Sequence, residues 1–310
     1  MKKLGIYWFS HDLRIDDNPT LATAAGEVDS LLCMAFANPS NRNNFHPIPI
    51  QLSKNRLNFL IQSFDDLDKK LKRLGQHLWV SEFQPEIEIP NLIANLGVTH
   101  LYLSDDGFLH NQSVIESLQR EFPSLIIRKI SDNRLYSEQD LPFSVDDLPD
   151  SFSKFRRKVE KISTRKPISC PGRLPNPITK PNNWQNKFKS HLNAQDSQFY
   201  GGESAGKKHL DKYFAGDFAS TYKLTRNALD GMYESTKFSP WLAHGCLSVR
   251  RIVERLHKYE DDVTSNESTY WIFFELLWRE YFQWYVKCHR ERIFLFSGIN
   301  DHKPNTSFYP

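Results

Sequence analysis

Five short hydrophobic runs recur through the first 136 residues of the chain. They lie at residues 4–9, 31–36, 78–80, 101–103 and 125–130. Runs of this length and composition predict strands. Between them, apolar residues recur at steps of three and four from Leu57 to Leu74, and Gly75 follows as a helix stop. Shorter helical patterns occupy 90–96 and 114–122. The region therefore predicts an α/β domain, a doubly wound, Rossmann-like parallel sheet with helices on both faces.

A sheet of this kind places ligand sites at the carboxyl ends of its strands. Here these are the segment after Phe9 and the segment 104–110. No glycine-rich loop follows the first strand, so the dinucleotide fingerprint and the P-loop are both missing from the sequence. This argues against an NAD enzyme and against a nucleoside triphosphatase.

The periodic pattern changes twice along the chain. It first fades into a proline-rich stretch, which predicts a long ordered linker. After Gly201 and Gly202 it becomes helical and aromatic, which predicts an all-α domain. The predicted organisation is an α/β domain at 1–136, a linker at 137–200 and a helical domain at 201–310.

Charge alone does not identify a partner, because the formal net charge is only +3. Any contact with a polyanion must come from a local basic patch. The linker contains one such cluster, made of Lys154, Arg156, Arg157, Lys158, Lys161, Arg165 and Lys166. It is interpreted mainly as a solvated face, and the alternative is added phosphate affinity.

The four cysteines form no close pair that could clasp zinc, and four in 310 residues do not make a disulfide framework. We therefore expect no metal and a reducing compartment, the cytoplasm. His11, Asp12 and Arg14 interrupt the first apolar run, which a signal peptide would not tolerate. The most apolar segment, 270–277, contains Glu275 and is too short to cross a bilayer, so no membrane is implied.

The segment 235–240 has the chemistry of an anion-binding turn. Ser239 is a good N-cap and Pro240 a good first helical residue, so the turn is expected at a helix N-terminus. Free amide groups and a partial positive charge favour anions there. With the hydroxyls of Ser235 and Thr236 and the ammonium of Lys237, the turn could hold a diphosphate. The alternative is an ordinary capped helix.

The segment 270–282 predicts a helix that is aromatic on every side and therefore lies inside the helical domain. Glu275 and Arg279 are four residues apart, and Trp278 is three residues from Glu275. A carboxylate, an indole and a guanidinium then line one side of the same two turns. The alternative is a buried ion pair beside a packed tryptophan.

Several of these motifs resemble one family in order and spacing. Tyr222, Arg226 and the run Ser-Thr-Lys-Phe-Ser-Pro from Ser235 are similar to the flavin-binding signature of photolyases and cryptochromes. The run Glu-Leu-Leu-Trp-Arg from Glu275 resembles the part of that family that borders the substrate cavity. The resemblance covers nearly the whole chain and implies that the helical domain binds FAD.

The resemblance also implies roles for individual residues. FAD binding would fall to Tyr222, Ser235, Thr236, Lys237, Phe238, Ser239 and Arg279. Arg226 would meet the DNA backbone. Glu275 would hydrogen-bond the damaged pyrimidine pair and Trp278 would stack on it, which makes these two the candidate catalytic residues. A flipped-out base pair is recognised in this way, by hydrogen bonds at its edge and a π surface on its face.

The run Tyr7 to Pro19 resembles the opening signature of the same family. Its residues are predicted to be structural, because Asp12, Arg14 and Asp17 can satisfy one another and the amide groups at the strand end.

The entry Gly-Gly-Glu-Ser-Ala from Gly201 and the run Ser-Thr-Tyr-Trp from Ser268 are similar to the DASH branch of cryptochromes. That branch implies a monomer that repairs cyclobutane pyrimidine dimers in single-stranded DNA. It also implies a 5,10-methenyltetrahydrofolate antenna in the α/β domain. Asp105, Asp106 and His110 stand where the antenna glutamates of the family are expected.

Family members continue beyond the point where this sequence stops, through the segment that closes over the flavin ring. We therefore expect the chain to be C-terminally incomplete and the aromatic helix to keep an open face. Two alternatives to repair remain open. One is a signalling cryptochrome that binds flavin without repairing DNA, and the other is an inactive truncated remnant.

Overall fold

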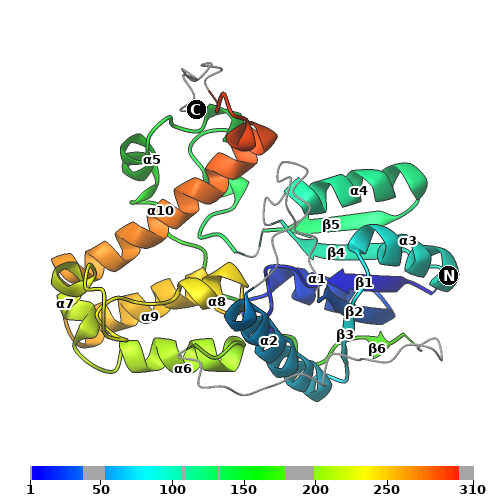
Figure 1. Cartoon of the computed structure of the whole chain (residues 1–310), viewed down its shortest axis with the longest axis horizontal. Coiled ribbons are helices and arrows are strands. Elements are labelled where there is room, and N and C mark those ends of the chain that lie inside the picture. The colour runs from blue at the N-terminus through cyan, green and yellow to red at the C-terminus, as the bar shows by residue number, and fades with distance from the viewer. Residues whose placement is uncertain (1, 38–52, 106–108, 132, 179–198, 300–310) are drawn as a thin grey trace, which may run out of the picture.

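The computed structural model describes residues 2–37, 53–105, 109–131, 133–178 and 199–299. The first domain is built on five parallel strands, which are β1 Leu4–Trp8, β2 Ser30–Phe36, β3 Leu78–Ser81, β4 His100–Ser104 and β5 Ile126–Ile130. Their order across the sheet is β3-β2-β1-β4-β5 (Figure 1). All five predicted strands are confirmed, with ends shifted by at most one residue.

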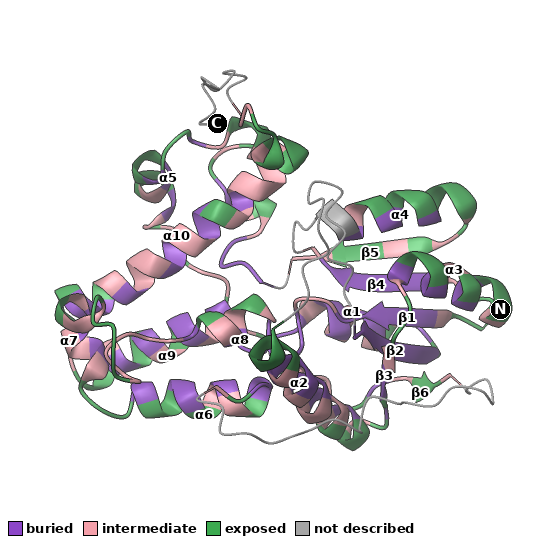
Figure 2. Cartoon of the chain, in the orientation of Figure 1, coloured by how far each residue is buried: buried purple, intermediate pink, exposed green. Residues whose placement is uncertain are grey.

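Helices cover both faces of this sheet, as predicted. They are α1 Pro19–Glu27, α2 Lys54–Arg73, α3 Pro85–Leu96 and α4 Leu109–Glu121. Successive side chains of a strand point to opposite faces. On β1, Ile6 and Trp8 accordingly join a core cluster with α3 and α4, whereas Tyr7 joins the cluster that contains α1 and α2. Because both faces are covered, the central strands are buried along their length (Figure 2).

The sequence pattern does not predict helix α1, because its nine residues contain few large apolar side chains. The helix forms where its start is well capped. The side chain of Asn18 accepts a hydrogen bond from the backbone N–H of Leu21 at 2.9 Å. Pro19 takes the first helical position, where its fixed φ angle suits the helix.

The described part of the predicted linker carries secondary structure and packs against both domains. It contains two short 3₁₀ turns, η1 Glu138–Asp140 and η2 Val145–Asp147, then helix α5 Phe152–Val159 and the short strand β6 Asn176–Pro177. Strand β6 pairs with β2 at the sheet, and α5 packs on the long helix of the second domain. The sequence does not predict α5 or β6.

The second domain is helical, as predicted. Its elements are α6 Glu203–Tyr213, α7 Phe218–Thr225, α8 Ser239–Ala243, α9 Val249–Asp262, α10 Glu267–His289 and the 3₁₀ turn η4 Arg290–Phe294. The core of this domain is continuous with the α1 and α2 side of the sheet. The ring of Phe59 on α2, for example, lies 6.1 Å from that of Trp241 on α8.

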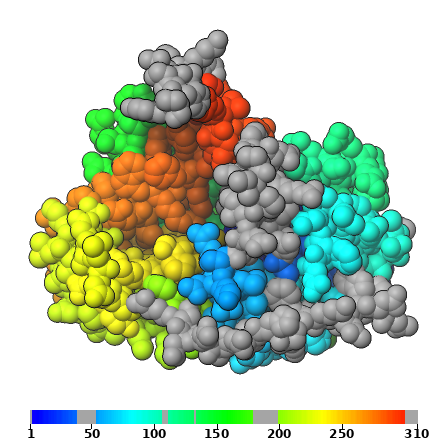
Figure 3. Space-filling view, viewed as in Figure 1, coloured from blue at the N-terminus to red at the C-terminus, as the bar shows by residue number. Residues whose placement is uncertain are grey.

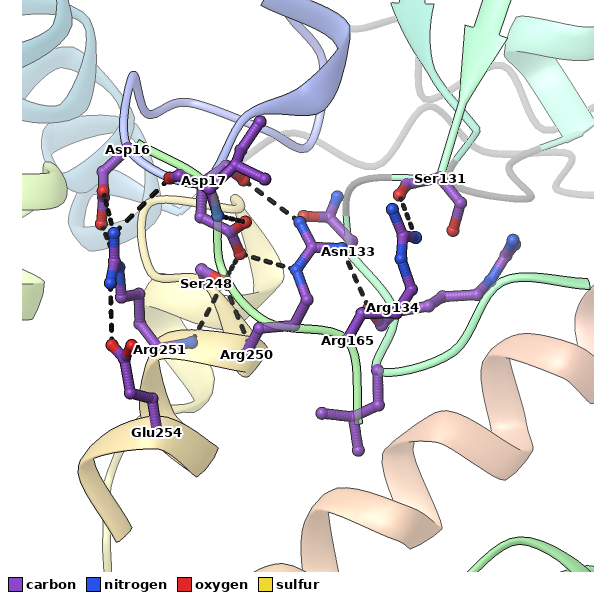
Figure 4. A network of polar contacts seen from close by, with 12 residues as sticks. Asp16, Asp17, Ser131, Asn133, Arg134, Arg165, Ser248, Arg250, Arg251 and Glu254 are labelled. Carbon is purple, nitrogen blue, oxygen red and sulfur yellow. Dashed lines mark hydrogen bonds and ion pairs between the residues drawn. The ribbon is translucent and has the colours of Figure 1, made fainter. Parts of the chain in front are cut away.

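A buried polar network also joins the two domains (Figure 4). The carboxylate of Asp17 lies 2.7 Å from Nε of Arg250 at the start of α9, and both side chains are almost fully buried. Nη2 of Arg14 donates to the carbonyl of Asp17 at 2.9 Å, and Asp12 accepts from the N–H of Ser10 at 2.9 Å. The predicted structural role of Asp12, Arg14 and Asp17 is therefore confirmed. The sequence does not predict the pairing of Asp17 with Arg250.

Helix α10 is not buried on every side, which corrects the sequence prediction. Eight of its 23 residues are buried, whereas 38% of Tyr270 and 55% of Phe282 are exposed. The space-filling view shows the orange surface of this helix exposed beside the yellow segment that includes α8 (Figure 3). The expectation that the helix keeps an open face is confirmed.

Candidate functional site

Helices α7, α8 and α10 and the turn before α8 line a pocket of about 370 Å³. This volume is near the lower end for small-molecule sites. The lining residues are Tyr222, Thr236, Phe238, Ser239, Leu242, Ala243, Ile272, Glu275, Leu276 and Arg279. Six of the predicted site residues are among them, and the remaining four are Arg226, Ser235, Lys237 and Trp278. Of the apolar lining residues only Phe238 was predicted. Ile272 and Leu276 were not, although Ile272 lies three residues before Glu275 on the same helix and Leu276 directly follows it.

The predicted anion-binding turn, residues 235–240, leads into α8 one residue earlier than predicted. Phe238, and not Ser239, is the N-cap of α8, and it makes no side-chain capping bond. Helix α8 has only five residues, so its dipole is much weaker than that of a long helix. The capacity of the turn for an anion therefore rests on its hydroxyls, its backbone amides and Lys237, whose φ angle of 49° is left-handed.

His209 on α6 supports this turn, a role that the sequence does not predict. Its Nε2 lies 2.8 Å from the carbonyl oxygen of Thr236. Burial lowers the pKa of His209, although the bond to Thr236 opposes this shift. A carbonyl oxygen only accepts, so Nε2 carries the proton and donates. The ring also stacks on Trp241 with the centroids 4.9 Å apart, which connects the turn to the core of the domain.

Tyr222 projects from α7 and is buried. Burial raises the pKa of Tyr222 to about 12, and the charge of Glu275 adds to this shift while that of Arg226 opposes it. The phenol is therefore protonated at neutral pH. It provides the pocket with a neutral hydrogen-bond donor.

Glu275 is held in the pocket wall by Arg226. Nη1 of Arg226 lies 2.6 Å from Oε1 of Glu275, and the two side chains are 28% and 34% exposed. The guanidinium of Arg226 lies over the ring of Trp271, 4.5 Å from its centroid. Two residues expected to contact DNA are therefore bonded to each other, with Trp271 as the platform beneath the guanidinium.

Arg279 connects the pocket to the α/β domain. Its Nη1 donates to the carbonyl oxygen of Asn133 at 2.7 Å. Burial lowers the pKa of Arg279 to about 10, and the charges of Arg14 and Arg134 contribute while that of Glu280 opposes the shift. The guanidinium is still positively charged at neutral pH, so it offers the pocket wall a cation close to the domain boundary.

Trp278, which was predicted to stack on the pyrimidine pair, does not line this pocket. Its ring stacks on Phe152 of α5 with the centroids 3.7 Å apart and the planes 15° from parallel. It also stacks on Phe282, one turn further along α10, with the ring centroids 5.6 Å apart. In this structure the indole joins α5 to α10, as the alternative of a packed tryptophan predicts.

The predicted antenna region is occupied by ion pairs where the structure describes it. Asp105 lies 2.5 Å from Nζ of Lys287 on α10 and 3.3 Å from Nη1 of Arg134. Burial acts to raise the pKa of Asp105, but the charges of Arg134, Lys287 and Lys129 outweigh it and lower the pKa overall. Asp106 and the side chain of His110 lie outside the described residues.

Three residues of the basic linker cluster line a second, open cavity of about 560 Å³ beside α5. Lys154, Arg157 and Lys158 line it together with Asp147 and Asp150. The ammonium of Lys154 lies 2.8 Å from the Asp150 carboxylate. Acidic residues thus interrupt the positive surface, which agrees with a solvated face.

Across the described residues, no helix combines the length and apolar character that a bilayer span requires. Nor does that part of the chain contain a group of three or more His, Cys, Asp or Glu side chains arranged to hold a metal ion.

The comparisons with known proteins agree with this architecture. The DNA photolyase family matches residues 5–175. A cryptochrome DASH from Vibrio parahaemolyticus is 43% identical over 99% of this chain and 69% of its own length. The crystal structure of a Synechocystis cryptochrome superposes with a TM-score of 0.83 at 31% identity, over 96% of this chain and 64% of that one. An archaeal photolyase from Sulfolobus tokodaii, solved with two FAD molecules, shares the fold at a TM-score of 0.63 and 20% identity, over 95% of this chain and 64% of that one.

The chain therefore belongs to the DNA photolyase family, which includes the cryptochromes. Within that family its similarity extends over nearly its whole length to proteins named cryptochrome DASH. The chain spans about two thirds of the length of the Vibrio relative and of the two solved structures.

Proposed function

We propose that the protein binds FAD in the pocket between α7, α8 and α10 and uses blue light to repair cyclobutane pyrimidine dimers in single-stranded DNA. The observation that carries the proposal is that six residues of the flavin and substrate signature line a single pocket, although they come from α7, from α10 and from α8 with the turn before it. Membership of the photolyase family supports the same conclusion.

The lining chemistry fits one wall of a flavin dinucleotide site. Phe238, Ile272 and Leu276 provide apolar surface for a ring. The Tyr222 phenol and the Arg279 guanidinium provide donors for anionic or carbonyl oxygens. Ser235 and Lys237 are neighbours of the lining residue Thr236 in the same turn, so we keep them in the proposed site. When bound, FAD supplies the light absorption and the electron transfer.

The residues of this chain would bind and orient the substrate. Arg226, partly exposed at the end of α7, is proposed to bind a phosphate of the DNA backbone. Glu275 is proposed to accept hydrogen bonds from the edge of the pyrimidine dimer. The apolar wall would exclude water around that carboxylate, which strengthens its hydrogen bonds.

Three finer parts of the proposal rest on the resemblance to the DASH branch. They are the preference for single-stranded DNA, a monomeric state and a 5,10-methenyltetrahydrofolate antenna in the α/β domain. For the antenna, Asp105 is the candidate residue whose side chain is described, and a folate would have to coexist with its ion pairs to Arg134 and Lys287.

The direct test is repair by the full-length gene product. The protein is purified, its visible absorption is recorded for bound flavin, and a dimer-containing single-stranded oligonucleotide is incubated with it under blue light and in the dark. We expect bound FAD and light-dependent loss of the dimer. A flavin-loaded protein that leaves the dimer intact in the light would contradict the repair proposal.

A signalling cryptochrome is the second candidate function, and the placement of Trp278 favours it. A repair site needs an aromatic surface against the flipped base, whereas Trp278 is stacked on Phe152. A light-induced change in flavin absorption without dimer repair would support the signalling function.

A further inference from the structure

The ion pair between Arg226 and Glu275 joins two side chains that are proposed to contact different parts of the DNA. The guanidinium is the proposed phosphate contact, and the carboxylate lies in the pocket wall. We propose that Glu275 masks Arg226 in the DNA-free protein, so that phosphate binding and base recognition occur by exchange of partners. The inference rests on the proposed function, because it assumes that Arg226 binds a phosphate and Glu275 a base edge.

The geometry makes such an exchange feasible. Each side chain of the pair is about one third exposed or less, and an ion pair that water still reaches contributes less net stability than a fully buried one. A phosphate can therefore replace the carboxylate at modest cost. The guanidinium also has a second support, since it lies over Trp271 at 4.5 Å. Arg226 can change its partner while the ring keeps it in place.

The cost of the exchange depends on what enters the pocket. Within the described residues, Arg226 is the cation that makes an ion pair with Glu275. An undamaged strand that takes Arg226 leaves the carboxylate without a partner beside the apolar Ile272 and Leu276, which is unfavourable. A dimer in the pocket replaces the lost bonds with the N–H groups of its bases. The pair would thus weaken binding of undamaged strands more than binding of damaged ones.

The control for Glu275→Gln has to remove one negative charge without releasing a cation near the pocket. Lys223 on α7 pairs with Glu267 on α10, but Glu267 is 68% exposed and does not line the pocket. Loss of Glu267 would also release a cation toward DNA, so it is not a clean control for charge. Glu116, exposed on α4 of the other domain, changes the net charge equally without releasing a cation near the pocket.

The experiment measures binding of undamaged and dimer-containing single-stranded oligonucleotides to the full-length protein at low salt. For Glu275→Gln we expect about two- to fivefold tighter binding of the undamaged strand, the range that corresponds to release of a partly exposed ion pair. We also expect weaker discrimination in favour of the dimer. Glu116→Gln should leave both affinities close to those of the parent.

The decisive comparison uses the Arg226→Ala background. There the gain from Glu275→Gln on undamaged DNA should disappear, because no guanidinium remains to be released. The exchange would be overturned if Glu275→Gln gave no gain in affinity for undamaged DNA. It would also be overturned if the gain were equal in the Arg226→Ala background or in Glu116→Gln. Unchanged thermal melting of Glu275→Gln would show that the variant is folded.

Failure of the proposed function gives a different result. If the parent binds undamaged strands but neither prefers nor repairs the dimer, the repair proposal fails, while the gain on undamaged DNA still tests the masking of Arg226. If the parent binds no single-stranded DNA, both the exchange and the repair proposal are overturned.

Discussion

Nη1 of Arg226 lies 2.6 Å from Oε1 of Glu275, although the two residues are 49 positions apart in the sequence. This contact brings the proposed phosphate ligand and the proposed base reader together at the edge of one pocket. The pocket, the ion pair and the stacking of Trp278 each lead to a measurement.

Arg226→Ala is expected to lower the affinity of the full-length protein for single-stranded DNA and to make its salt dependence shallower. A lysine or arginine that binds a phosphate releases counterions, and its loss reduces the magnitude of the slope of log K against log salt by about 0.7 for a single strand. Bound flavin should be retained. The measurement is a salt titration with Arg120→Ala, an exposed cation on α4, as the control. An unchanged slope would remove Arg226 from the DNA surface.

Trp278→Ala is expected to lower the melting temperature, because Trp278 loses a close stack on Phe152. Buried aromatic truncations cost about 3–5 kcal/mol, and this half-buried ring should cost less. Phe152→Ala should lower the melting temperature further, because Phe152 is buried and also packs on Phe274 and Tyr281. The double mutant should lose less than the sum of the two single losses. The substrate role predicts something else, namely a loss of about 1–3 kcal/mol in discrimination for the dimer. If Trp278→Ala weakens discrimination for the dimer and Phe152→Ala does not, Trp278 stacks on the substrate.

Residues 1–310 alone are expected to retain little FAD. The described pocket of about 370 Å³ presents one wall of a site, and association costs an estimated 4–15 kcal/mol or more before contacts yield net affinity. The measurement is an absorption spectrum after incubation with excess FAD and desalting, together with a repair assay under blue light. Both should be negative. Stoichiometric retained flavin would show that these residues are sufficient for binding.

His244, the residue that ends helix α8 in the helical domain, is expected to lower the free energy of unfolding as the pH falls from 6.5 to 4. Burial lowers its pKa from 6.5 to about 4, and the charges of His11 and Arg56 contribute. In that window the unfolded chain takes up a proton that the folded protein does not, so the stabilisation is complete above pH 6.5 and is lost as the pH falls. The difference is roughly 3 kcal/mol at most.

The measurement for His244 is thermal melting between pH 7 and pH 4.5. His244→Gln should flatten the pH dependence, whereas His77→Gln, which changes an exposed histidine on the other domain, should not. Identical slopes in the parent and in His244→Gln would rule out His244 as the source.

The strands and the long helices follow from the sequence alone, because their apolar residues repeat with a period that backbone geometry imposes locally. The family follows in the same way, because the signature residues around Tyr222, Arg226 and Glu275 stand in short continuous runs of the sequence. Helix α1 was not predicted, because it is stabilised by the Asn18 cap and by burial against the sheet and not by an apolar stripe. The predicted N-cap of α8 was wrong by one residue, because N-cap preferences rank residue types and do not fix the backbone angles that decide where a helix begins.

The partner that each polar or aromatic side chain takes depends instead on tertiary packing. Spacing along α10 predicted that Glu275, Trp278 and Arg279 share one side, but the indole stacks on α5, which the sequence did not predict. Likewise, Arg226 pairs with Glu275 and Asp17 with Arg250 across long separations in the chain. These contacts depend on how helices and domains pack against each other. Local periodicity carries no information about that arrangement, because it describes which face of an element is apolar and not what covers it.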